Sequence, residues 1–196
     1  MFRSIALAAL LALAIVPSSR ATTVLPISLA TMTRASDLIV HGTVTGSRVE
    51  AVNGNERHLR TIVDVSVTEL LRGAPGTRTV QLQLMGGRLG KWAMEIPGMP
   101  TFSAGEEVVL FLEKTSVNWA LTGLAQGKFT VFAGEGGKKM VRRKLDGLHF
   151  VALTEKKSPD TAAVPLIGQP DGGRVQALDA LLAEVRALVA RPAPLP

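Results

Sequence analysis

The amino-acid sequence predicts a mainly β protein whose strands close into a small barrel. Three observations lead to this fold class. Short runs rich in Val and Leu alternate apolar with polar residues, which is the pattern of half-buried strands. Turns containing Gly, Asn or Pro separate these runs, and one amphipathic helix follows them. Closure into a barrel removes unpaired strand edges, which suits a chain that has no Cys and therefore no disulfide.

The first barrel strands are expected at residues 37–49, 59–71 and 80–84. In the second of these, the valines at alternate positions from Val63 to Val67 share one face, and polar residues occupy the other. A turn signal rich in Gly follows each strand. We therefore expect three separate strands, each with one face toward the core.

The run EVVLFL at residues 107–112 is apolar on both faces. We expect it to be a central strand that is covered on both sides. The remaining strands are expected to form two hairpins. One would pair 118–122 with 127–132 through Gly123, and the other 139–144 with 148–153 through Asp146 and Gly147.

Two helices and two irregular segments complete the expected domain organisation. A short N-terminal helix is expected within residues 26–36, where Leu29 and Met32 share a face. The barrel domain would span residues 22–155, followed by a Pro- and Gly-containing linker at 156–173. An amphipathic helix at 174–190 would pack on the barrel and precede a Pro-rich tail at 191–196. Its apolar stripe comprises Val175, Leu178, Leu181, Leu182, Val185, Leu188 and Val189.

Residues 1–21 have the pattern of a secretory signal peptide. Arg3 precedes an apolar run at residues 5–16, and Ala21 ends a small-residue cleavage site. The apolar run is shorter than the roughly 20 residues that a membrane-spanning helix needs. We therefore expect cleavage near Ala21, a mature chain that begins at Thr22 without a transmembrane segment, and a secreted or periplasmic location.

Composition and motifs favour a binding protein over an enzyme. The net charge of +6 and the two Trp fall short of the basic, aromatic surface of a nucleic-acid binder. The sequence has no phosphate-binding P-loop and no GxSxG nucleophile motif. Its three His are far apart, and His41 has the spacing of a barrel-wall residue. Glu106 and Glu107 are adjacent on a strand and should point to opposite faces. We therefore expect no catalytic residue, no cofactor and no metal.

The strongest candidate site is the loop at residues 86–105. Unstructured connections longer than about 12–15 residues tend to be binding loops. Met and Trp suit adaptable contacts with a protein partner. The alternative is that the apolar side chains of the loop fold back and plug the end of the barrel. The candidate partner-binding residues are Met85, Arg88, Trp92, Met94, Ile96, Met99 and Phe102.

A basic run, KKMVRRK at residues 138–144, is the second candidate site. It could bind a polyanion or an anionic surface of the cell envelope. The alternative is a solvated hairpin whose charges prevent the edge pairing of strands. The candidate residues are Lys138, Lys139, Arg142, Arg143 and Lys144.

The segments at residues 35–46, 61–73 and 105–112 resemble the netrin-like domain of the tissue inhibitors of metalloproteinases. The resemblance is closer still to exported bacterial proteins of the same layout, which offer no biochemical role to carry over. It implies an OB-type five-stranded barrel with a helix after it. The inhibitors chelate the zinc of their targets through an N-terminal Cys, which this chain lacks, so their mechanism does not carry over. The leading hypothesis is an exported, non-enzymatic binding or scaffold domain whose partner is a protein.

Overall fold

The computed structural model describes residues 22–150 and 173–191. The expected signal peptide lies outside these residues, as do nearly all of the expected linker and most of the expected tail. Within the described ranges, no helix is long and apolar enough to span a membrane.

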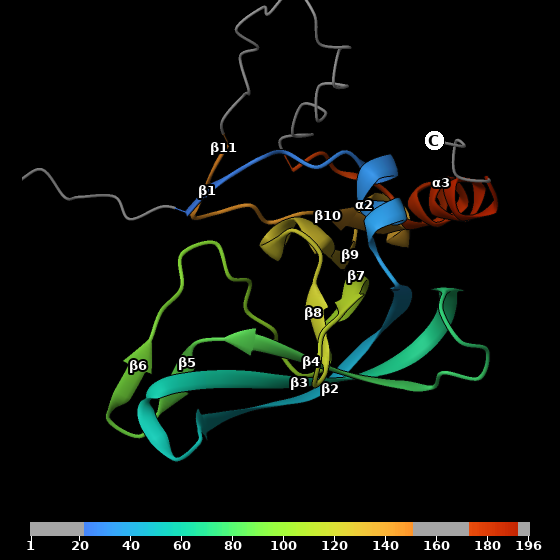
Figure 1. Cartoon of the computed structure of the whole chain (residues 1–196). Coiled ribbons are helices and arrows are strands. Elements are labelled where there is room, and N and C mark those ends of the chain that lie inside the picture. The colour runs from blue at the N-terminus through green and yellow to red at the C-terminus, as the bar shows by residue number, and fades with distance from the viewer. Residues whose placement is uncertain (1–21, 151–172, 192–196) are drawn as a thin grey trace, which may run out of the picture.

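Five strands close into a barrel in the lower half of Figure 1. β2 pairs antiparallel with both β3 and β7, and β3 pairs with β4. β8 then closes the barrel, because it pairs in parallel with β4 and antiparallel with β7. The barrel strands are β2 (Leu38–Val52), β3 (Asn55–Arg72), β4 (Thr79–Met85), β7 (Glu107–Lys114) and β8 (Trp119–Leu121). The expected fold class, a mainly β barrel with a short N-terminal helix and a C-terminal helix, is confirmed.

The central strand β7 separates two apolar cores. Val108 and Leu110 belong to the core inside the barrel, together with Val63 and Leu82 of neighbouring strands. Phe111 points the other way, into a core between the sheet and the C-terminal helix. This confirms the expectation that both faces of the EVVLFL strand are covered.

Two helices lie close together above the barrel (Figure 1). Helix α2 (Leu29–Ala35) starts at Ser28, whose hydroxyl accepts a hydrogen bond from the Thr31 N–H as an N-cap. Helix α3 (Leu178–Ala190) buries Leu178, Leu181, Leu182 and Val185 against the outer core. It begins four residues later than expected, because β12 (Gln176–Ala177) pairs with β10 (Lys139–Arg142). Val175 therefore precedes the helix and is exposed, which corrects its assignment to the apolar stripe.

The first expected hairpin is wrong. β8 and β9 (Lys128–Ala133) do not pair with each other; each pairs with β7, along the same edge. β8 pairs with residues 112–114 of β7, and β9 pairs with residues 108–110 of β7. A 3-10 turn, η1 (Leu124–Gly127), separates them, and Gly123 before it has a left-handed φ of 69°. The long edge of β7 is thus filled by two short strands in succession.

The second expected hairpin is also wrong in its described part, although its turn exists; residues 151–153 of its second strand lie outside the described residues. The N–H of Leu148 donates to the carbonyl of Leu145, and Gly147 has a φ of 78°, as the turn requires. The chain that leaves this turn is β11 (Leu148–Phe150), which pairs in parallel with β1 (Thr22–Val24) rather than with β10. On the edge opposite to β12, β10 pairs with β9, to which the short turn η2 (Glu135–Gly137) connects it.

The loop at residues 86–105 is not an unstructured connection. It contains a small hairpin of β5 (Gly87–Leu89) and β6 (Trp92–Met94), which projects beside the barrel (Figure 1). After β6 the chain runs without regular structure to β7. In that part, Met99 and Phe102 pack against the core inside the barrel.

Candidate functional site

Six of the seven candidate loop residues line one cavity of about 660 Å³, which we call the groove. Its walls are the end of β4, the β5–β6 hairpin and the chain that follows β6. Apolar side chains predominate, with Arg88 and Glu95 as the charged lining residues. The six candidate residues are Met85, Arg88, Met94, Ile96, Met99 and Phe102. Methionine side chains are unbranched and polarizable, so this wall can adapt to different apolar ligands.

The residues that line the groove range from almost fully buried to exposed. Leu84 is almost fully buried, whereas its neighbour Met85 is 60% exposed at the surface. Met99 and Phe102 are half-buried, because they also pack against the core inside the barrel. The later part of the loop therefore covers the barrel core, as the second alternative expects. Apolar surface stays open at the other end of the groove, where the binding role remains a prediction.

Close backbone packing fixes the hairpin on β3. The N–H of Gly86 donates to the carbonyl of Leu59 at 2.8 Å, and the Thr61 hydroxyl donates to the Gly86 carbonyl at 2.7 Å. Gly86 has a φ of 93° and its Cα faces the Met94 carbonyl, so a side chain would not fit there. The groove wall is therefore anchored to the barrel at its base.

Trp92 is the candidate that does not line the groove. Its indole N–H donates to a carboxylate oxygen of Glu56 at 2.6 Å. Arg57 and Lys91 lie over its ring at 5.9 and 5.3 Å from the centroid. These contacts join β6 to the start of β3, which gives Trp92 a role in holding the hairpin.

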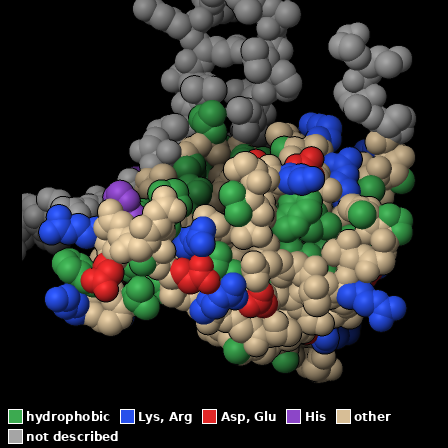
Figure 2. Space-filling model, turned by 60° about the horizontal axis from the view of Figure 1, so that its bottom comes forward, with side chains coloured by type: hydrophobic (Ala, Val, Ile, Leu, Met, Phe, Trp, Pro, Cys, Tyr) green, Lys and Arg blue, Asp and Glu red, His purple; other side chains and the backbone are tan. Residues whose placement is uncertain are grey.

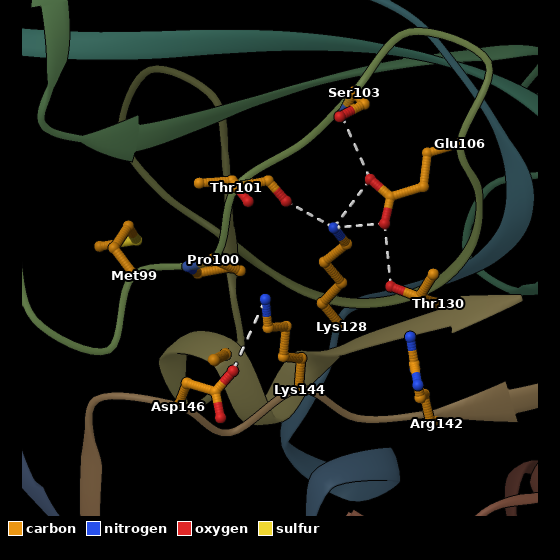
Figure 3. A pocket seen from close by; sticks show the side chains of 11 residues that line it. Met99, Pro100, Thr101, Ser103, Glu106, Lys128, Thr130, Arg142, Lys144 and Asp146 are labelled. Carbon is orange, nitrogen blue, oxygen red and sulfur yellow. Dashed lines mark hydrogen bonds and ion pairs between the residues drawn. The ribbon is translucent and has the colours of Figure 1, made fainter.

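A second cavity, of about 340 Å³, lies next to the groove, and we call it the basic pocket (Figure 3). At its centre Lys128 Nζ lies 2.7 Å from Glu106 Oε1 and donates to the Thr101 carbonyl at 2.5 Å. The Thr130 hydroxyl also donates to Glu106, at 2.9 Å. The pocket is lined in addition by Arg142, Lys144 and Asp146. Its polar groups come from three separate parts of the chain.

The surroundings of Lys128 lower the pKa of its side chain. Burial lowers the pKa of its ammonium below the usual 10.5, and the nearby Glu106 carboxylate offsets only part of this effect. The ammonium also lies over the Phe102 ring, 4.1 Å from its centroid. Phe102 thus belongs to the groove and at the same time contacts the central cation of the basic pocket.

The charged side chains of the basic run lie in different environments. Arg142 and Lys144 line the basic pocket, whereas Lys139 donates to both oxygens of Glu107, at 2.8 and 2.9 Å. Arg143 is buried, with its guanidinium 5.1 Å from the centroid of the Phe129 ring. Lys138 is exposed beside the turn. The alternation of side chains along a strand accounts for this division.

Glu106 and Glu107 point to opposite faces, as expected from their adjacency. Glu106 enters the basic pocket, whereas Glu107 lies 2.7 Å from Nε2 of the buried His41. Burial acts to raise the pKa of Glu107, but hydrogen bonds from Lys139 and His41 together outweigh it, and the pKa lies below its ordinary 4.5. In the described part of the chain, no three His, Asp or Glu side chains gather closely enough to hold a metal ion.

Sequence reasoning missed Lys128, the central residue of the basic pocket. The one available signal was a lysine at the start of a strand otherwise rich in apolar residues, which needs a carboxylate partner once it is buried. The partner, Glu106, lies 22 residues away in sequence, directly after the candidate loop.

The chain matches no protein-family model, no curated protein and no solved structure.

Proposed function

We propose that this protein is an exported, non-enzymatic binding domain that holds a segment of a partner protein in the groove. The observation that carries the proposal is the gathering of six candidate loop residues in one open, mainly apolar cavity of about 660 Å³. This volume lies within the usual range of binding cavities, about 300–1,000 Å³.

Two features of the groove support binding over simple packing. Met85 keeps 60% of its surface exposed, although it lies beside a buried apolar strand. The hairpin that forms one wall is anchored to β3 through Gly86, so the groove does not have to form when a ligand arrives. A preformed apolar surface lowers the entropic cost of binding.

The resemblance to netrin-like domains is part of the same proposal. A closed barrel of five strands with a helix after it agrees with the layout that the resemblance implies. The netrin-like domains of the metalloproteinase inhibitors act by binding another protein, which favours a protein partner here. Because the inhibitors use an N-terminal Cys and this chain has no Cys, we propose a different contact surface.

The alternative function, binding of an anionic envelope surface through residues 138–144, is less well supported. Arg143 is buried, and Lys139, although exposed, donates to both oxygens of Glu107, so the run does not present five charges on one face. On the face of the molecule shown in Figure 2, Lys and Arg side chains are interspersed with Asp and Glu. A salt titration of binding to anionic liposomes tests this alternative, which expects binding at low salt and its steep loss as salt rises.

Site-specific photo-crosslinking tests the proposed groove. A photoreactive amino acid would replace Met85 at the groove and, as the matched control, Val117, which is 72% exposed and does not line the groove. We expect a discrete adduct with one protein of the exported fraction at position 85 and none at position 117. Equal adducts at both positions, or none at position 85, would contradict the proposal.

Export is tested by the mass of the protein recovered from outside the cytoplasm. We expect its chain to begin at Thr22. In the structure the N–H of Thr22 donates to the Gly147 carbonyl at 3.1 Å, and its hydroxyl donates to the Pro97 carbonyl at 2.5 Å. The new amino group would therefore dock beside the groove, since Pro97 and Gly147 both line it. Exported protein that retains Met1 would contradict the secretory pattern.

A further inference from the structure

We propose that the basic pocket binds an acidic side chain of the same partner segment whose apolar side chains occupy the groove. The inference rests on the proposed function and adds to it the chemistry of the partner: an extended peptide with a Glu or Asp next to apolar residues. Arg142 and Lys144 belong to the basic run that the sequence offered as a polyanion site, whereas Lys128 at the centre of the basic pocket was not among the expected site residues.

The two cavities share a wall. Met99, Pro100 and Thr101 line both the groove and the basic pocket. These three consecutive residues follow the hairpin and have no regular structure. In Figure 3 Met99 lies at one end of this wall, and Lys128 and Lys144 face the other end. A single chain that crosses the wall can place neighbouring side chains in both cavities.

The charge in the basic pocket favours one negative group. Three cationic side chains, Lys128, Arg142 and Lys144, line the pocket with two carboxylates, Glu106 and Asp146. Lys128 and Glu106 carry opposite charges 2.7 Å apart, so this pair adds no net charge to the pocket. The contact of Lys144 with Asp146 is long, at 3.6 Å, and both side chains are 79% exposed, so this pair is weak in water. The three cationic side chains and two carboxylates therefore leave the pocket with a net charge of +1.

Arg142 is the side chain best placed to recognise that negative group. It is exposed, and its guanidinium lies over the Phe132 ring at 5.1 Å from the centroid, which limits its orientations. A guanidinium presents two parallel N–H donors that match the two oxygens of a carboxylate. Lys144, two residues beyond the end of β10, supplies a second cation that lines the same pocket.

A carboxylate fits these features better than a phosphate does. The pocket carries one unit of positive charge in excess, which balances a carboxylate, whereas a phosphate monoester carries close to two negative charges at pH 7. The adjoining groove is lined mainly by apolar groups, which match a peptide with apolar side chains. The shared wall therefore favours a protein segment over a free inorganic anion.

Selection from a displayed random-peptide library on the full mature protein tests the inference. We expect enriched peptides to carry a Glu or Asp next to a group of apolar residues. A synthetic peptide of the enriched sequence should lose about tenfold in affinity when its acidic residue is replaced by the corresponding amide. The double variant Arg142→Gln/Lys144→Gln should bind both peptides equally.

The matched control is Arg78→Gln/Lys114→Gln, which removes the same charge from exposed residues that line neither cavity. It should keep the preference for the acidic peptide, and both double variants should melt like the wild type. Enrichment of apolar peptides without an acidic residue would overturn this inference while supporting the groove. Failure to enrich any peptide would overturn both. Displacement of the acidic peptide by inorganic phosphate but not by acetate would assign the pocket to phosphate and overturn the inference.

Discussion

The buried Lys128 and the half-buried Glu106 form an ion pair that joins the first residue of β9 to the residue directly after the candidate loop. Their side chains are 8% and 18% exposed, and Nζ lies 2.7 Å from Oε1. The same ammonium donates to the Thr101 carbonyl and lies over the Phe102 ring. The pair therefore fixes the part of the loop that separates the groove from the basic pocket.

Breaking this pair should destabilise the protein. We expect Lys128→Met and Glu106→Gln each to lower the free energy of unfolding by about 3 kcal/mol, because each leaves a largely buried charge without its oppositely charged partner. The double variant should lose less than the two single losses combined. Urea unfolding measures all three, with Lys139→Met as the control. Lys139 is 59% exposed in its pair with Glu107, so its loss should be about 1 kcal/mol or less. Additive losses in the double variant would mean that the pair is not coupled.

The lowered pKa of Glu107 predicts a dependence of stability on acid. Because the folded protein holds this carboxyl ionised more strongly than the unfolded chain does, Glu107 stabilises the fold above its ordinary pKa of 4.5. That contribution is lost as the pH falls from 4.5 through the lower folded pKa. We expect the melting temperature of Glu107→Gln to fall less steeply than that of the wild type over this range. Parallel curves would show that Glu107 contributes nothing to the acid response.

Gly42 in β2 should not tolerate a side chain. A Cβ at this position would lie 2.3 Å from the carbonyl oxygen of Ser66 on β3, where the pairing register shifts. We expect Gly42→Ala to cost about 1–3 kcal/mol, because backbone would have to move. The matched control is Gly46→Ala in the same strand, where no atom lies within 4 Å of the added Cβ. Urea midpoints that shift equally in the two variants would exclude the steric cause.

The elements that depend on local periodicity were predictable from the sequence. β2, β3, β4 and β7 lie where alternating or continuous apolar residues place them, and α2 lies within its expected range. The two expected hairpins failed because their pairing is not local. β8 and β9 are adjacent in sequence, but each pairs with three residues on the same edge of β7.

The sequence predicted most of the side chains that line the groove, but it did not predict how the residues of the site are arranged in space. The length and composition of the loop identified the groove residues, since a long connection rich in Met points to exposed apolar surface. The orientation of Trp92 depends on Glu56 and Arg57, which belong to a different strand. The basic pocket depends on Lys128 and Glu106, which only the folded barrel brings together. Contacts between residues that are far apart in sequence produce no periodic pattern from which they could be predicted.

The central claim, that the groove binds a protein partner, is tested most directly by measuring affinity and stability on the same two variants. Met85→Glu places a charge on the exposed lip of the groove, and Phe102→Ala removes a half-buried ring from the barrel core. With the partner identified by crosslinking, we predict that Met85→Glu weakens binding at least tenfold, a loss of about 1.4 kcal/mol, and leaves the thermal melt unchanged. Phe102→Ala should lower the melting temperature. Full affinity in Met85→Glu, with a native melt, would contradict the assignment of the groove as the binding surface.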